Sequence, residues 1–198
     1  MPRTLVIATR NRGKYREMAA ILRPLDVSLV PLDAFGDVAP VPETGDTFEA
    51  NARAKALGYA RATGQWALGD DSGLEVDALD GAPGVRSARW GGQDGNDALN
   101  NQTLLAALAD HPPDTWTARF RCVMALAMPD RVLAVTEGTC EGLITADAAG
   151  SNGFGYDPHF YLPARGRTMA ELPAAEKNRL SHRARALARM KNHLKKLL

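Results

Sequence analysis

The segment from Trp116 to Met128 constrains the fold most, because apolar residues recur there at every second position. Such alternation predicts a half-buried β-strand. Pro129-Asp130-Arg131 then reverses the chain into the apolar run Val132-Leu133-Ala134-Val135. The segment therefore predicts an antiparallel hairpin. Its alternating residues are Trp116, Ala118, Phe120, Cys122, Met124 and Leu126.

Helix and strand patterns alternate on both sides of this hairpin, without repeats or low-complexity tracts. Further strands are predicted at Leu5-Val6-Ile7-Ala8, Trp66-Ala67-Leu68 and Phe160-Tyr161-Leu162. Helices are predicted over 14–22, from Asp46 or Thr47 to Gly64 with Glu49 completing a capping box, over 97–108, and in one long run from Pro173 nearly to the end. These patterns predict an α/β fold with a mixed sheet and one folding unit spanning residues 1–198, rather than two lobes sharing a sheet.

Composition narrows the class of protein. The 198 residues are 45% hydrophobic and 24% charged, and no apolar run approaches the roughly 18 residues of a membrane span. The N-terminal run lacks the features of a signal peptide, so we expect a cytoplasmic protein. A net charge of +1 argues against stable nucleic-acid binding. Cys122 and Cys140 have no zinc-like spacing and are predicted to be reduced, buried thiols.

The acidic pair Asp70-Asp71 lies directly after the predicted strand at Trp66-Ala67-Leu68, in what we expect to be a loop. Neighbouring side chains on an extended backbone point to opposite faces, so each carboxylate needs its own partner. One is predicted to bind a ligand and the other to brace the site. A carboxylate there suits Mg²⁺, which often takes one or two carboxylates alongside substrate phosphates. An Asx-turn without further function is the alternative.

A basic loop, Thr9-Arg10-Asn11-Arg12-Gly13-Lys14, joins the first strand to the first helix. Free N–H groups and the helix dipole favour an anion there, with phosphate the natural candidate. The loop is not a Walker A motif, and solvated basic residues are the alternative. Ahead of the second helix, Glu43 is a candidate second metal ligand. Lys55, on that helix's predicted exposed face with Asn51, could neutralise phosphate, although a solvated lysine is the alternative.

Two later segments could recognise a nucleobase. Gly153-Phe154-Gly155-Tyr156-Asp157-Pro158 places two aromatics and a carboxylate among glycines, a composition suited to stacking a purine; aromatics that enter the core are the alternative. On the last helix, Lys177, His182 and Arg183 are candidate donors to a ring carbonyl oxygen, and a solvated basic face is the alternative.

Taken together, the motifs resemble the inosine triphosphate pyrophosphatase family over most of the chain. The resemblance rests on five blocks in order: Thr9-Arg10-Asn11-Arg12-Gly13-Lys14; Glu43-Thr44-Gly45-Asp46-Thr47-Phe48 with Asn51-Ala52 and Lys55; Asp70-Asp71-Ser72-Gly73-Leu74 with Gly81-Ala82-Pro83-Gly84 and Ser87-Ala88-Arg89; Gly153-Phe154-Gly155-Tyr156-Asp157-Pro158; and Glu176-Lys177-Asn178 with Ser181-His182-Arg183. One departure is Pro42, where bacterial members often carry a second Glu.

The resemblance implies an elongated mixed sheet flanked by helices, two lobes with a cleft between them, a homodimer, and Mg²⁺-dependent hydrolysis of non-standard purine nucleoside triphosphates such as ITP, dITP and XTP to the monophosphate and pyrophosphate. By position, Asp71 would be the catalytic carboxylate, and Glu43 and Asp71 would contact the metal, with Asp70 as the supporting neighbour. The triphosphate would be held by Thr9, Arg10, Asn11, Arg12, Gly13, Lys14, Lys55 and Ser72. The base would be framed by Phe154, Gly155, Tyr156 and Asp157, with Lys177, His182 and Arg183 completing the pocket.

The predicted chemistry is in-line attack of water on the α-phosphorus, with Asp71 accepting the proton and cationic groups stabilising the departing pyrophosphate. Arg183 and His182 would select the base by donating to its six-keto oxygen. Two alternatives remain from the sequence: a module that binds nucleotides or single-stranded RNA without turnover, and a Maf-like pyrophosphatase acting on modified pyrimidines.

Overall fold

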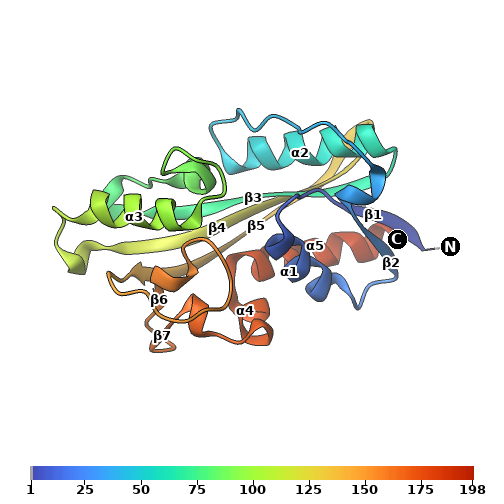
Figure 1. Cartoon of the computed structure of the whole chain (residues 1–198). Helices are drawn as coiled ribbons and strands as arrows, with labels where there is room; N and C mark the ends of the chain where they lie inside the picture. The colour runs from blue at the N-terminus through green and yellow to red at the C-terminus, as the bar shows by residue number, and fades with distance from the viewer. Residues whose placement is uncertain (1) are drawn as a thin grey trace. The chain divides into compact units, whose positions relative to one another are not determined.

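The described part of the chain, residues 2–198 of a computed structural model, contains one seven-stranded sheet in the order β2-β1-β3-β4-β5-β6-β7 (Figure 1). β1 runs parallel to both β2 and β3, with Leu5 opposite Leu29 and Trp66. β6 is antiparallel to β5 and β7. The predicted mixed sheet is therefore confirmed. The strands are β1 (Arg3–Ile7), β2 (Val27–Pro31), β3 (Trp66–Val76), β4 (Thr117–Met128), β5 (Arg131–Ile144), β6 (Phe160–Leu162) and β7 (Arg167–Thr168).

The predicted hairpin is confirmed as β4 and β5. They are neighbours in the sheet and only Pro129 and Asp130 separate them, a connection short enough to join only antiparallel strands. β5 continues to Ile144, well beyond the predicted run ending at Val135. The longer strand arises because later residues such as Leu143 gain partners on β6, which a local pattern does not reveal.

The prediction of a loop at the acidic pair is wrong, because β3 continues through both aspartates to Val76. Glycine and aspartate are poor strand formers, so propensity alone ended the predicted strand early. Gly69 is required by packing: a Cβ there would lie 2.7 Å from the backbone nitrogen of Ala56 and 2.9 Å from the carbonyl oxygen of Ala52. Helix α2 therefore packs with its backbone directly on the strand at this point.

Side-chain caps mark the N-termini of α1 and α2, and a glycine marks the C-terminus of α2. Asn11 caps α1 by accepting from the Lys14 amide. Thr47, and not Asp46, caps α2, so the predicted capping box is wrong, whereas Gly64 ends this helix in the left-handed conformation as predicted. The predicted helix over 97–108 is confirmed as α3. The helices are α1 (Arg12–Leu22), α2 (Phe48–Thr63), α3 (Asp97–Leu108), α4 (Ala174–Leu180) and α5 (His182–Leu197).

The predicted long C-terminal helix is wrong in one respect, because it is two helices. Ser181 has an extended backbone between α4 and α5, and Pro173 precedes α4 as its N-cap instead of opening it. The break coincides with a division of the chain into two compact units. Unit 1 is the chain up to Asp71 with Cys122–Gly138 and His182–Leu198, and unit 2 is Ser72–Arg121 with Thr139–Ser181. Strands β3, β4 and β5 contribute residues to both units.

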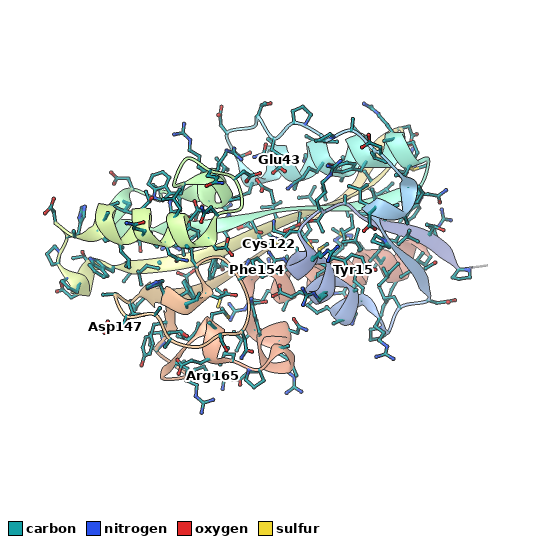
Figure 2. The ribbon with its side chains drawn as sticks, in the orientation of Figure 1. Tyr15, Glu43, Cys122, Asp147, Phe154 and Arg165 are labelled. Atoms are coloured by element: carbon teal, nitrogen blue, oxygen red, sulfur yellow. The ribbon has the colours of Figure 1, made fainter. Side chains whose placement is uncertain are left out.

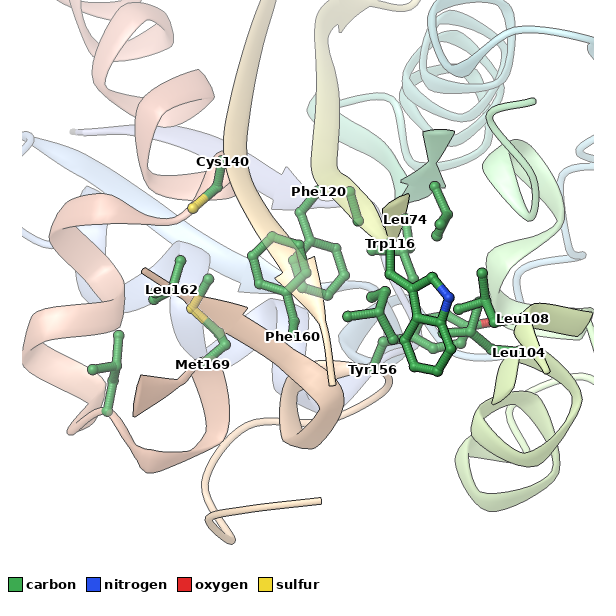
Figure 3. Packing of buried hydrophobic residues seen from close by; sticks show 14 residues of the cluster. Leu74, Leu104, Leu108, Trp116, Phe120, Cys140, Tyr156, Phe160, Leu162 and Met169 are labelled. Atoms are coloured by element: carbon green, nitrogen blue, oxygen red, sulfur yellow. The ribbon is translucent and has the colours of Figure 1, made fainter. Parts of the chain in front are cut away.

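Each unit has its own apolar core. In unit 1, α2 covers one face of the sheet and α1 and α5 cover the other (Figure 1). Its core residues come from β1, β3, β4, β5, α1 and α5, and include Leu5, Met18, Leu68, Met124, Leu187 and Met190. In unit 2, the rings of Phe120 and Phe160 pack at a tilt of 43° with centroids 4.4 Å apart, beside Leu74 and Trp116 (Figure 3).

Both cysteines are free and buried, which confirms that prediction. Burial raises the pKa of the Cys122 thiol to about 12, so it stays protonated at neutral pH. Within residues 2–198, no helix combines the length and the apolar character needed to cross a membrane.

Candidate active site

Asp70 and Asp71 have separate sets of partners, as their alternation along a strand predicts. The Asp70 carboxylate lies 3.0 Å from the Lys14 ammonium on α1 and 3.7 Å from Nε of Arg183 on α5. The Asp71 carboxylate instead accepts a hydrogen bond from Nδ2 of Asn51 at 3.0 Å, on α2. The two carboxylates therefore belong to opposite faces of β3.

Asp70 is an ionised carboxylate that orients the side chains of Lys14 and Arg183. It is fully buried, and burial alone would raise its pKa, but the charges of Lys14, Arg183 and Lys55 together hold the pKa below its ordinary value. A carboxylate held between an ammonium and a guanidinium fixes the side chains of both. This geometry agrees with the predicted division between a bracing and a reacting carboxylate.

Asp71 differs from its neighbour in its electrostatics. Burial is the largest influence and raises its pKa above the ordinary value, against the opposing effects of Lys55, Lys14 and the hydrogen bond from Asn51. A carboxylate of raised pKa binds a proton more readily than one with an ordinary pKa. Asp71 is therefore chemically suited to accept a proton from water.

Lys55 joins Asp71 to Glu43. Its ammonium lies 2.9 Å from Oε2 of Glu43 and 3.7 Å from Oδ1 of Asp71. Burial would lower the pKa of Lys55, but the carboxylates of Asp70, Asp71 and Glu43 outweigh it and raise the pKa. With 8% of its surface exposed, Lys55 is not a solvated lysine, and the prediction of an exposed helix face for Asn51 and Lys55 is wrong.

Among Asp71, Lys55 and Glu43, the side chain most exposed to solvent is that of Glu43 (Figure 2). Glu43 lies on the segment before α2, and 36% of its side chain is exposed, against 9% for Asp71. Gly45, two residues further along the chain, is held against α2, since the Gly45 amide donates to Oδ1 of Asn51 at 2.8 Å. Asn51 thus ties both the Glu43 segment and Asp71 to α2, a role that was absent from the predicted site. The sequence signal that could have placed Asn51 in the site is its spacing of four residues from Lys55, which puts both side chains on one face of the helix.

The basic loop before α1 borders a cavity of about 580 Å³. Four of the predicted phosphate-binding residues line it, together with Tyr15, Arg16, the last residue of β2 and the segment after β2. The loop is held by two hydrogen bonds: the Asn11 amide donates to Oγ1 of Thr9 within the loop, and Arg10 donates to the Val38 carbonyl outside it. The lining residues are Thr9, Arg10, Asn11, Arg12, Tyr15, Arg16, Pro31, Leu32, Asp33, Gly36, Asp37 and Val38.

The 153–157 loop belongs to unit 2. Asp157 is buried there in an ion pair with Lys177 of α4, at 2.5 Å, and the Lys177 ammonium lies 4.7 Å from the centroid of the Phe154 ring. Tyr156 is different, because it is part of the unit 2 core and its hydroxyl donates to the Ser87 carbonyl at 2.8 Å. Burial and the Asp97 charge raise the pKa of Tyr156. The alternative of a core aromatic therefore holds for Tyr156, and Phe154 is left half-buried (Figure 2).

His182 and Arg183 begin α5, in unit 1. Arg183 is 1% exposed, and its guanidinium pairs with Glu17 of α1 at 2.5 Å as well as with Asp70. His182 is also buried. The alternative of a solvated basic face is therefore wrong for these two residues, and Glu17 is a partner that the sequence interpretation missed. Their role as donors to a base stays a prediction.

The donor set around Asp71 fits a magnesium ion bound together with substrate. Among residues 2–198, no group of three or more His, Cys, Asp or Glu side chains is placed to hold a metal ion. Glu43 and Asp71 supply two carboxylates that approach the same ammonium, so one small cation could contact both. Mg²⁺ is commonly bound by one or two carboxylates with substrate phosphates completing its shell, whereas a structural zinc site needs four protein ligands.

Comparison with known proteins identifies close relatives. The model of the Ham1 family matches residues 5–193. A dITP/XTP pyrophosphatase of Desulforamulus reducens is 49% identical over 98% of this chain and 96% of that protein, and one of Geobacillus kaustophilus is 51% identical over 94% and 91%. A solved HAM1 protein from Coxiella burnetii has a TM-score of 0.88 at 41% identity, covering 98% of this chain and 99% of that one.

Proposed function

Since this chain belongs to the Ham1 family, we propose that it hydrolyses non-standard purine nucleoside triphosphates, namely dITP, XTP and ITP, to the monophosphate and pyrophosphate. Its relatives over nearly the whole chain are named dITP/XTP pyrophosphatase, so the chain is an enzyme of the nucleoside triphosphate pyrophosphatase class. The resemblance inferred from the sequence motifs is thereby confirmed. The nucleotides on which this chain acts, its metal and the roles of its residues belong to the proposal.

One observation carries the proposal: Asp71, a buried carboxylate of raised pKa, lies beside Lys55 and shares that lysine with Glu43. Hydrolysis of a phosphoanhydride needs a proton acceptor for the attacking water and positive charge for the triphosphate. Asp71 would take the proton as the water oxygen bonds to the α-phosphorus and the bond to pyrophosphate breaks. Lys55 would move from the carboxylates onto phosphate oxygens.

A divalent metal requirement is suggested by the family, and Mg²⁺ is the ion that we propose. Glu43 and Asp71 would hold it, and it would supply positive charge to neutralise the triphosphate. Lys14 and the N–H groups at the start of α1 would hold phosphate oxygens, with Asp70 keeping Lys14 oriented. Thr9, Arg10, Asn11, Arg12, Gly13 and Ser72 complete the proposed phosphate-binding set.

Base selection is proposed to depend on Phe154 to Asp157 with Lys177, and on His182 and Arg183. Phe154 offers an aromatic face, and the cationic residues offer donors that match the six-keto oxygen of hypoxanthine or xanthine. Adenine carries an amino group at this position, which leaves such donors without a partner and costs binding energy. Arg183 is fixed by Glu17 and Asp70, so a donor group there would be rigid rather than adaptable.

The decisive experiment measures pyrophosphate release from XTP, dITP, ITP, ATP, GTP and modified pyrimidine triphosphates, each with and without Mg²⁺. We expect turnover of XTP, dITP and ITP far above that of ATP, and loss of activity after chelation. Equal rates for ITP and ATP would refute base selection, a preference for pyrimidines would favour a Maf-like enzyme, and binding without turnover would refute the enzyme. Sedimentation of the same sample tests the proposed homodimer. That the two units act as one catalytic domain, in the cytoplasm, also stays a prediction.

A further inference from the structure

Helix α3 holds the backbone of the 153–157 loop at Gly155. The Asp97 carboxylate accepts a hydrogen bond from the Gly155 amide at 2.7 Å, and Nδ2 of Asn101 donates to the Gly155 carbonyl at 2.9 Å. Both polar groups of one glycine are therefore bound by side chains one turn apart on α3. All of these residues belong to unit 2.

The first turn of α3, which carries Asp97, is held by a side-chain cap and by a hydrogen bond from Asn101. Asn96 caps the helix by accepting from the Leu99 amide at 3.0 Å. Nδ2 of Asn101 also donates to the Asp97 carbonyl at 2.9 Å, which links the two residues that hold the loop. Side chains four residues apart on a helix lie on one face, so the pair can bind both the amide and the carbonyl of one residue.

Gly155 has no side chain whose packing could fix its backbone. Its φ of +65° lies in the left-handed region, where glycine is permissive, and a Cβ there would meet nothing within 4 Å. Packing of a side chain therefore does not set the backbone at this point. Two hydrogen bonds from α3 set it instead, one of them to the Asp97 carboxylate.

The residue before Gly155 is the one that we propose to face the base. Phe154 is fixed on its other side as well, because its amide donates to the Asp157 carboxylate at 2.9 Å and the Lys177 ammonium lies over its ring. Lys177 of α4 holds the loop through its ion pair with Asp157, and Asp97 and Asn101 hold it from α3. Loss of the α3 contacts would remove the support that reaches Phe154 through Gly155.

We infer that Asp97 and Asn101 are positioning residues, which act through Gly155 to fix the orientation of Phe154 toward the nucleobase. This inference rests on the proposed function, because it names the residues that shape its base-recognition loop. Neither residue lies in the group around Asp71, so the chemistry at the phosphates should be preserved when they are changed. Their loss should raise KM and weaken discrimination between bases, with kcat nearly unchanged.

The test compares Asp97→Ala and Asn101→Ala with two matched controls. Asp94→Ala removes an exposed carboxylate from the turn that precedes α3, and Gln102→Ala shortens an exposed side chain on the helix; neither control residue makes a described contact with the loop. The first measurement is hydrogen exchange of the Gly155 amide in the protein without substrate. We expect Asp97→Ala to exchange about fivefold faster, because a hydrogen bond to a charged group is lost at a solvent-accessible site.

The second measurement is the kinetics of XTP and ATP hydrolysis. Both test variants should raise KM for XTP about fivefold, lower the XTP-to-ATP ratio of kcat/KM, and change kcat by less than about twofold. Asp97→Asn keeps an acceptor oxygen without its charge, so its KM should lie between wild type and Asp97→Ala. The controls should match wild type in both measurements.

Two results would overturn the inference: exchange at Gly155 that is unchanged in Asp97→Ala, or faster exchange with an unchanged KM and base preference. Failure of the proposed function itself has a different signature, namely a wild-type protein that hydrolyses none of the triphosphates. In that event inosine 5′-monophosphate is titrated into wild type and Asp97→Ala, with the Phe154 amide resonance followed. Weaker binding in the variant would support the inference, and no perturbation in wild type would refute it.

Discussion

Replacing Asp70 by Asn isolates the contribution of the buried charge that braces Lys14 and Arg183. The substitution preserves the shape of the side chain and removes its charge. Asp70 is fully buried, so two cationic groups would lose a partner in a region of low dielectric. Breaking a buried ion pair by removing one partner costs about 3–5 kcal/mol. Arg183 retains Glu17 and the Lys14 side chain is 16% exposed, so we expect the lower end, about 3 kcal/mol.

The pH dependence of stability gives a second, independent expectation for this variant. Because the pKa of Asp70 is lowered in the folded protein, its stabilising contribution is complete above the unfolded value of about 3.9 and is lost as pH falls toward the folded pKa. Wild type should therefore lose stability in acid through this group. Asp70→Asn lacks the titration, so its free energy of unfolding should decline less steeply below about pH 4.

Urea unfolding followed by circular dichroism measures both effects. The exposed Asp130 in the β4–β5 turn offers a matched control, and Asp130→Asn should stay within about 0.5 kcal/mol of wild type. A loss of less than about 1 kcal/mol in Asp70→Asn at pH 7 would refute the reasoning, since it would mean that the charge of Asp70 contributes no more than an exposed ion pair. An unchanged slope in acid would contradict the assigned direction of the pKa.

Four further predictions concern the reaction and the packing of the same strand. Asp71→Asn should lower kcat by about 10²–10⁴-fold while urea unfolding stays cooperative, and near-normal turnover would exclude Asp71 as the proton acceptor. Lys55→Met removes the charge that most lowers the pKa of Asp71, so the acid limb of the pH–rate profile should move to higher pH; a profile that stays in place would contradict this coupling. Hydrolysis in ¹⁸O-water should place the label in the monophosphate, whereas label found only in pyrophosphate would indicate attack at the β-phosphorus. Gly69→Ala should destabilise the protein by about 1–3 kcal/mol, because the added methyl meets the α2 backbone, and thermal unfolding at the wild-type temperature would show that α2 shifts freely.

Sequence patterns predicted well where one local signal decided the structure. The apolar residues of α3 and its flanking breakers located this helix at Asp97–Leu108, and Gly64 ended α2 as its conformational freedom predicts. The hairpin followed from a period-two pattern and a two-residue turn. The family resemblance supplied the candidate site because its motifs could be matched without knowing how they meet.

Errors arose where partners distant in the chain outweigh local preference. Gly69, Asp70 and Asp71 are poor strand residues, yet they are held in β3 by α2 on one face and by cations of α1 and α5 on the other. The helical pattern after Pro173 hides the break at Ser181, which separates residues that pack in different units. Lys55 looks solvated on a helical wheel, and only the approach of Glu43 and Asp71 explains its burial.

The amino-acid sequence alone determined which residue types are available for chemistry, and the alternation of a strand required Asp70 and Asp71 to face opposite ways. Only the tertiary structure decided what each of them meets: Lys14 and Arg183 for one, Asn51 and Lys55 for the other. The physical reason is that a carboxylate's pKa depends on its burial and on the charges around it, and both are set by packing between segments far apart in the chain. The same two adjacent aspartates are therefore driven in opposite directions, one toward permanent ionisation and the other toward binding a proton.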